Sequence, residues 1–229
     1  VYAAEQSSIS APGGDADIAV IRAGESPMLE KRIPLPSYIT TGSTFFLAVS
    51  PNGQSLYVTA TDKNGNDAVY AINLNTDEVT AMPSGSFSEP ISVAISPDGM
   101  RAFVLNEGSG YITVINTSNN TIIANITTGY TNPSEIIISP DGSTLYVLDQ
   151  GNSQIGTINS ENYTINTIPL SSRPSGMALS SDGNTLYVSE SSNTIEVVNI
   201  QGGGSQTIPT LNDDSGLALT PDNTKLFAS

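Results

Sequence analysis

The 229-residue sequence contains no cysteine, no histidine and no tryptophan. Without thiol or imidazole side chains, the chain cannot build a Ser-His-Asp triad, a cysteine nucleophile or a zinc site of nitrogen and sulfur ligands. Any general base would have to be a carboxylate with a raised pKa. Since there is no cysteine, the composition carries no information about the redox compartment.

Basic residues and long apolar runs are also scarce. Lysine and arginine number 7 against 22 aspartates and glutamates, and the formal net charge is −15. A surface of that sign repels phosphate backbones and anionic lipids, so we expect no nucleic-acid partner. Apolar stretches such as residues 45–49 fall far short of the roughly 20 residues that a membrane-spanning helix needs, so we expect no such segment.

One phrase recurs along the chain: an apolar run, a turn of the type Ser-Pro-Asp-Gly and a run of the type Leu-Tyr-Val. The five copies begin at Leu47, Val93, Ile136, Met177 and Leu217, and residues 1–3 repeat the second half of the phrase. Successive aromatic residues of the phrase are 55, 46, 43, 41 and 40 residues apart. Each period holds two further strand-like runs, and four short strands per 40 or so residues are typical of a propeller blade. The sequence therefore predicts an all-β fold, a β-propeller of four-stranded antiparallel blades.

The repeat register predicts a single propeller domain over residues 1–229 with about five blades. Complete blades are expected at about 45–84, 91–129, 134–170 and 175–209, and partial blades at 1–35 and 216–229. The two partial segments together make one blade with a spare second strand. This leaves two alternatives open, a closed five-bladed ring or part of a seven-bladed ring. In the closed ring the spare strand would be available for self-association with another molecule.

The turn, the Leu-Tyr-Val run and the Val-Ile-Asn sequence at residues 114–116 resemble YVTN-type β-propeller repeats. This resemblance extends over nearly the whole chain and implies seven blades. It also implies an extracellular or cell-surface protein, since the family includes archaeal surface-layer proteins, whereas related propellers act as lactonases and lyases. We expect a non-enzymatic structural or interaction module of a surface layer, filament or adhesion-type scaffold. The alternative is a metal-dependent hydrolase or lyase such as a lactonase.

The main candidate binding residues lie where second strands end and where blades are linked. In a propeller both kinds of loop open on the face around the central channel, where the resemblance to this fold places ligands. Such carboxylates could bind a cation or a cationic group, and a protein or glycan partner is also expected there. The alternative is an acidic rim that only contacts solvent. The candidates are Glu5, Asn106, Asp149 and Glu190 at strand ends, and Glu89, Asn132, Arg173, Asp213 and Asp214 in the linkers.

A second candidate site is a polar loop with oxygen-bearing residues at alternate positions. Its possible calcium ligands are Asp62, Asn64, Asn66 and Asp67. The loop lacks the glycine at the sixth place and the glutamate at the twelfth that an EF-hand requires. We therefore favour a polar hairpin with an Asn-Gly turn, with Ca²⁺ as the alternative and no other cofactor.

Two further sets of residues recur. Asp98, Asp141, Asp182 and Asp222 occupy the Pro-Asp-Gly position, where aspartate typically accepts hydrogen bonds from its own turn. We interpret them as turn residues. Asn-x-Ser/Thr sequons predict glycosylation of a secreted chain at Asn116, Asn119, Asn125 and Asn162.

Overall fold

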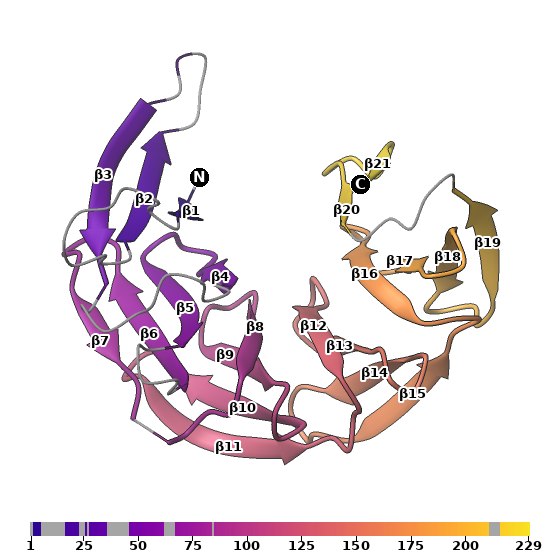
Figure 1. Cartoon of the computed structure of the whole chain (residues 1–229), viewed down its shortest axis with the longest axis horizontal. Helices are drawn as coiled ribbons and strands as arrows, with labels where there is room; N and C mark the ends of the chain where they lie inside the picture. Colours follow the sequence, from indigo (N-terminus) through magenta and orange to yellow (C-terminus); the bar gives the residue numbers. More distant parts are fainter. Residues whose placement is uncertain are drawn as a thin grey trace. The chain divides into compact units, whose positions relative to one another are not determined.

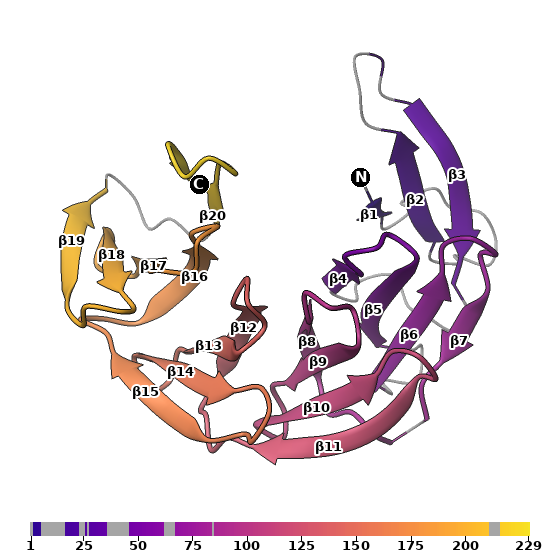
Figure 2. The same ribbon diagram turned by 180° about the vertical axis from the view of Figure 1, so that it is seen from behind.

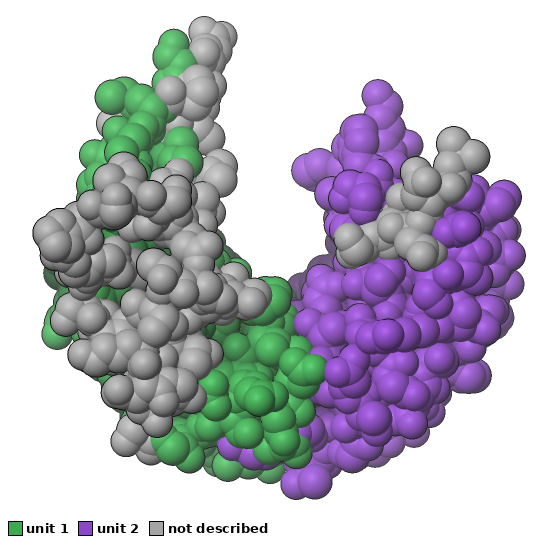
Figure 3. Space-filling model, in the orientation of Figure 1, with its two compact units in different colours: residues 1–109, 113–125 green, residues 110–112, 126–229 purple. Residues whose placement is uncertain are grey.

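The computed structural model describes residues 2–5, 17–22, 26, 28–35, 46–61, 67–83, 85–210 and 216–229. These residues form β-strands joined by turns and short connections, and no helix occurs among them (Figure 1). The chain divides into two compact units (Figure 3). The first comprises residues 1–109 and 113–125, and the second comprises residues 110–112 and 126–229.

The first unit contains a three-stranded sheet, a four-stranded sheet and most of a second four-stranded sheet. Each is antiparallel, with strands that are neighbours in sequence pairing side by side (Figure 1). The strands are β1 (Tyr2–Glu5), β2 (Asp17–Arg22), β3 (Met28–Pro34), β4 (Phe46–Val49), β5 (Ser55–Thr61), β6 (Asp67–Asn73), β7 (Val79–Ala81), β8 (Pro90–Ile95), β9 (Arg101–Asn106), β10 (Tyr111–Asn116) and β11 (Thr121–Thr127).

The second unit repeats the same construction with two four-stranded sheets and a final strand pair (Figure 2). Its strands are β12 (Pro133–Ile138), β13 (Thr144–Asp149), β14 (Gln154–Asn159), β15 (Ile165–Pro169), β16 (Pro174–Leu179), β17 (Thr185–Glu190), β18 (Thr194–Asn199), β19 (Ser205–Pro209), β20 (Leu217–Leu219) and β21 (Leu226–Ala228). These sheets confirm the predicted all-β propeller of four-stranded antiparallel blades, with about five blades in the chain. No helix in the described ranges has the length and apolar character needed to cross a bilayer.

The repeated turn joins the first and second strands of each blade through the same hydrogen bonds. Ser96 Oγ donates to Asp98 Oδ1 at 2.5 Å and accepts from the backbone nitrogen of Arg101 at 2.9 Å. Gly99 has φ 72°, a left-handed conformation that glycine adopts without strain. In the last copy Asn223 occupies this position with φ 58°.

The turn carboxylates behave as the turn interpretation predicts. Hydrogen bonds from the turn hydroxyl and from backbone or side-chain groups two residues further on lower the pKa of all four aspartates. They are Asp98, Asp141, Asp182 and Asp222. Their chemistry is therefore local, which confirms that they are turn residues.

Apolar side chains between neighbouring sheets form the core of each unit. In the second unit, Tyr146 and Leu148 of β13 pack with Met177 and Val188 of the next sheet. Tyr146 is only 3% exposed. The aromatic residue of the repeat thus contributes to packing between blades, and burying it removes a large apolar surface from water.

Candidate functional site

The ends of the second strands and the linkers that precede each blade lie together at one edge of each sheet. We call this edge the linker face, and it comprises residues 86–89 and 106–110, 130–132 and 149–153, and 171–173 and 190–193. Antiparallel pairing dictates this arrangement, because a second strand runs back towards the point where the first strand began. Most of the predicted binding residues are on the linker face.

The predicted strand-end residues of three successive blades make one repeated contact. Asn106 accepts a hydrogen bond from the backbone nitrogen of Ser88 at 3.1 Å, and Asp149 accepts one from that of Thr131 at 2.9 Å. Glu190 likewise accepts one from the backbone nitrogen 18 residues before it, at 2.9 Å. All three acceptor side chains are at most 1% exposed. We call this contact the linker clasp, because it attaches the linker to the second strand of the blade that it enters.

Asp149 is enclosed by further partners. Its Oδ2 accepts hydrogen bonds from Asn152 Nδ2 at 2.8 Å and from Gln154 Nε2 at 2.7 Å. The ring of Tyr130 lies over Gly156, where a Cβ atom would come within 1.9 Å of the tyrosine hydroxyl. Burial, together with the charge of Asp149, raises the pKa of Tyr130 well above its ordinary value. A glycine at position 156 is therefore what admits the Tyr130 ring, whose hydroxyl is buried.

In the next blade the same region holds two carboxyl groups, Glu190 and Glu196, which are 1% and 3% exposed. They hydrogen-bond to each other, and Thr194 Oγ1 donates to Glu190 Oε2 at 3.0 Å. Burial, with the neighbouring Glu196 carboxylate adding to it, raises the pKa of Glu190. Burial acts in the same direction on Glu196, but hydrogen bonds from Ser205, Ser171 and Glu190 outweigh it and lower its pKa. The pair therefore holds one proton over a range of pH around the ordinary value.

Sequence reasoning missed Glu196, although a signal was present. It is the single charged residue in the apolar run of β18, residues 195–198. It pairs in register with Val188, two residues before Glu190 on the neighbouring strand. Side chains two residues apart on a strand share a face, so this register places both glutamates on the same side of the sheet.

On the exposed side of the linker face, two predicted residues meet through a third. Gln150 Oε1 accepts hydrogen bonds from Asn132 Nδ2 at 3.0 Å and from Arg173 Nη2 at 2.7 Å. Asn132 and Arg173 come from successive linkers, and both are exposed. The structure therefore brings these two candidates together, and Gln150 is the residue that sequence reasoning did not single out.

The remaining candidates are more scattered. Glu89 is exposed, has φ 50° and donates its backbone N–H to Asp67 Oδ2 at 2.8 Å. Asp67 is therefore a linker acceptor, whereas Asp62, Asn64 and Asn66 of the calcium loop lie outside the described residues. Asp213 and Asp214 also lie outside them, and Glu5 ends β1 in register with Asp17. Among the described residues, no three aspartate or glutamate side chains gather into a group that could hold a metal ion.

Three of the four sequon asparagines lie at the turns between third and fourth strands. Asn116 Oδ1 accepts hydrogen bonds from Ser118 N at 2.9 Å and Ser118 Oγ at 2.7 Å. Asn119 and Asn162 make corresponding bonds with the residue two positions later. Asn125 is an exposed residue of β11. Their glycosylation stays a prediction.

A comparison with protein-family models matches residues 93–213 to the family described as "Lactonase, 7-bladed beta-propeller". The match spans more than half of the chain. The chain belongs to this lactonase family. The predicted membership of a β-propeller family is thereby confirmed. The match does not support the finer prediction of a YVTN-type or surface-layer propeller. A search of curated proteins found no match to this lactonase-family chain.

Solved structures similar to this lactonase-family propeller include proteins of diverse description. Hydrazine synthase of Kuenenia stuttgartiensis is 26% identical with a TM-score of 0.68, and the match covers 80% of this chain and 54% of that chain. A functionally unknown protein of Desulfotomaculum acetoxidans is 17% identical with a TM-score of 0.72, over 100% and 78% of the two chains. A proposed 6-phosphogluconolactonase of Bacteroides uniformis is 18% identical with a TM-score of 0.68, over 99% and 73%. The chain thus spans about half the length of the first of these proteins, and the last two likenesses concern the fold alone.

Proposed function

We propose that this propeller is a non-enzymatic interaction module that is secreted or displayed at the cell surface. The observation that carries the proposal is the linker clasp. Asp149 and Glu190 are buried, and both oxygens of each carboxyl group accept hydrogen bonds from the protein. A general base or metal ligand needs an oxygen that can reach the reacting molecule, and these oxygens are already used.

The exposed part of the linker face supports a binding role. Asn132 and Arg173 are held by Gln150 in a fixed arrangement, and amide and guanidinium groups donate hydrogen bonds to carbonyl or hydroxyl oxygens of a protein or glycan. The net charge of −15 argues against nucleic acid as the partner. The YVTN-type repeat resemblance supports the surface location and a surface-layer or filament context.

The second candidate function is lactone hydrolysis. The family model and the Bacteroides uniformis structure favour it. In a chain without histidine, Glu190 fits the requirement for a base, since its pKa is raised. On this proposal Ca²⁺ or Mn²⁺ would bind near Asp149 and Glu190. Both side chains would first have to release their hydrogen bonds to the linker backbone.

A hydrolysis assay with metal analysis separates the two functions. The purified chain is incubated with δ-gluconolactone and γ-butyrolactone, with and without Ca²⁺ or Mn²⁺, and acid release is followed in a pH-stat. We expect the spontaneous rate and no stoichiometric metal. Turnover that requires metal and is lost in Glu190→Gln, but kept in the exposed control Glu161→Gln, would establish the hydrolase instead. Calorimetric Ca²⁺ titration of the wild type and of Asp149→Asn/Glu190→Gln gives the second readout.

A further inference from the structure

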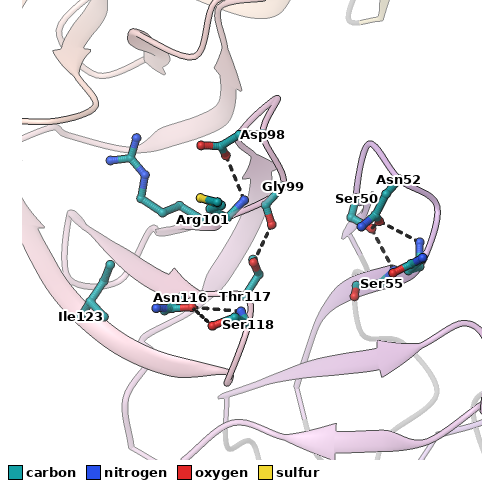
Figure 4. Close-up of a pocket in the computed structure, with 12 residues that line it drawn as sticks. Ser50, Asn52, Ser55, Asp98, Gly99, Arg101, Asn116, Thr117, Ser118 and Ile123 are labelled. Atoms are coloured by element: carbon teal, nitrogen blue, oxygen red, sulfur yellow. Dashed lines mark hydrogen bonds between the residues drawn. The ribbon is translucent and has the colours of Figure 1, made fainter.

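A cavity of about 580 Å³ lies in the first unit, at the blade edge opposite the linker face. We call this edge the turn face, because it carries the turns between first and second strands and between third and fourth strands. The cavity is lined by the β4–β5, β8–β9 and β10–β11 turns of two successive blades (Figure 4). Its volume is within the range of about 300–1,000 Å³ that is usual for small-molecule sites.

Two side-chain amide groups in this cavity form hydrogen bonds through their oxygen atoms alone. Asn52 Oδ1 accepts hydrogen bonds from Ser50 Oγ at 2.7 Å and Gln54 N at 3.0 Å. Asn116 Oδ1 accepts both hydrogen bonds from Ser118 (Figure 4). Within the described part of the chain, neither Asn52 Nδ2 nor Asn116 Nδ2 donates a hydrogen bond. Two donors are therefore available to a ligand.

Asp98 supplies an acceptor beside two exposed apolar side chains. Ser96 Oγ and Met100 N both donate to Asp98 Oδ1, and Oδ2 accepts neither of them. These hydrogen bonds lower the pKa of Asp98, so the group is a carboxylate at neutral pH. Met100 and Ile123, which also line the cavity, are 67% and 51% exposed. Polar groups and an apolar surface are thus presented together.

The repeat provides an internal comparison in the second unit, where a matching cavity of about 430 Å³ lies between the β12–β15 and β16–β19 blades. There, Ser143 Oγ donates to both carboxylate oxygens of Asp141. Asn184, at the repeat position of Met100, donates its Nδ2 to Asp182 Oδ2 at 3.1 Å. In that cavity Oδ2 of both turn aspartates therefore accepts a side-chain hydrogen bond from within its own turn. Among the described residues, Oδ2 of Asp98 accepts no such bond, because Met100 stands where Asn184 stands in the second unit.

We propose that the cavity on the turn face of the first unit binds a neutral saccharide. Each sugar hydroxyl both donates and accepts, which matches the amide donors of Asn52 and Asn116 and the carboxylate acceptor of Asp98. The apolar C–H face of a sugar ring packs against Met100 and Ile123. Asp98 and Arg101 give the lining one charge of each sign, which suits a neutral polar ligand, and the net charge of −15 further disfavours an anion. The site is independent of any hydrolysis at the linker face.

Two conservative variants test the cavity without disturbing the turns. Asn52→Asp keeps the Oδ1 acceptor, as Asp98 does in the next blade, but removes the Nδ2 donor. Met100→Asn adds the side chain that bonds to the aspartate in the second unit. Asp141→Asn makes the reverse change in the matching cavity and serves as the control. The chain is produced without N-glycosylation, because Asn116 is itself in a sequon.

The experiment measures binding to an array of neutral gluco-, manno-, galacto- and chito-oligosaccharides, with oligogalacturonate and chitosan oligomers as charged counterparts. Calorimetry then gives the affinity for the strongest neutral binder. We expect a preference for neutral oligosaccharides, a roughly tenfold weaker affinity in each cavity variant, as the loss of one hydrogen bond allows, and no change in Asp141→Asn. Failure of every neutral oligosaccharide to bind, stronger binding of either charged oligomer, or equal affinity in all variants would overturn the proposal.

Discussion

Polar residues at the same repeat position of this propeller differ in their electrostatic surroundings, because their neighbouring side chains differ. Asp149 lies beneath the linker with amide donors on both sides, whereas Glu190 faces a second carboxyl group. Both residues occupy the same repeat position, yet their electrostatic surroundings differ. The difference arises at position 156 in one blade and its equivalent, Glu196, in the next.

The carboxyl pair predicts a specific pH dependence. Glu190 has a raised pKa in the folded state, so its contribution to stability is complete below the ordinary pKa of 4.5 and is lost as the pH rises through the raised value. Glu196 has a lowered pKa, so its contribution is present above 4.5 and is lost as the pH falls through the lowered value. The wild type should therefore lose stability as the pH rises above 4.5, whereas Glu190→Gln lacks this loss. The free energy of unfolding of the variant should rise relative to that of the wild type over this range.

Urea denaturation at a series of pH values between about 4 and 8 measures this difference. The exposed variant Glu161→Gln should follow the wild-type curve throughout. Glu196→Gln should be less stable than the wild type at neutral pH, because it removes the carboxylate that accepts hydrogen bonds from Ser171 and Ser205. If Glu190→Gln and the wild type kept a constant difference across the whole range, the shared proton would be ruled out.

At the level of strands and linkers, two kinds of contact stabilise the blades. Apolar residues pack between neighbouring sheets of each unit, and the linker clasp attaches each linker by a hydrogen bond to a buried polar side chain. The first kind supplies most of the free energy, since it removes apolar surface from water. The second fixes where each blade begins.

Replacing Asp149 with asparagine should weaken the clasp. Asn keeps an acceptor for the backbone nitrogen of Thr131 but presents an NH₂ group to Asn152 or Gln154, which are themselves donors. An unsatisfied buried donor costs about 1–3 kcal/mol of unfolding free energy. Chemical denaturation gives the value. A loss below experimental error would show that the carboxylate is not needed by its neighbours.

Truncating Tyr146 should be among the most damaging single changes. Tyr146→Ala removes a side chain that is 3% exposed between two sheets and should cost about 3–5 kcal/mol. Phe227 occupies the same repeat position but is 59% exposed, so Phe227→Ala is the matched control and should change stability little. Thermal unfolding of both variants tests the assignment, and similar losses would contradict it.

The elements could be predicted from sequence because their determinants are local. Ser96, Asp98 and Gly99 specify a turn within a few residues, and the repeat multiplies that signal. The candidate site could not be predicted to the same depth. The burial of Asp149 depends on hydrogen bonds from Thr131, Asn152 and Gln154, side-chain and linker contacts that the repeated phrase does not specify. The propeller fold, unlike the site, could be predicted, since the match to a seven-bladed propeller family agrees with the repeat period of the sequence.

Over the whole molecule, the dominant physical property is the net charge of −15. Lys31 and Asp77 form an ion pair within the first unit, but both side chains are partly exposed, so it contributes little. Self-repulsion among the remaining carboxylates opposes the compact state. The stability of this protein therefore depends on pH and salt concentration more than that of a protein with balanced charge.

Added salt should consequently stabilise the chain. Raising NaCl from about 20 mM to about 500 mM shortens the Debye length from roughly 20 Å to 4 Å and screens the repulsion. We expect the thermal midpoint at pH 7 to rise by several degrees. The same titration at pH 4.1, near the isoelectric point, should give a much smaller rise. A midpoint that falls with salt at pH 7 would mean that attractive ion pairs outweigh repulsion.

The constant separation of 18 residues in the linker clasp has a kinetic consequence. Closing a loop of that size costs much less chain entropy than closing one across several blades. During synthesis, a blade can therefore secure its own entry point once its second strand has left the ribosome, before later blades exist. Each newly emerged segment would be protected in turn from pairing with the wrong repeat, a hazard for any chain that carries the same phrase five times.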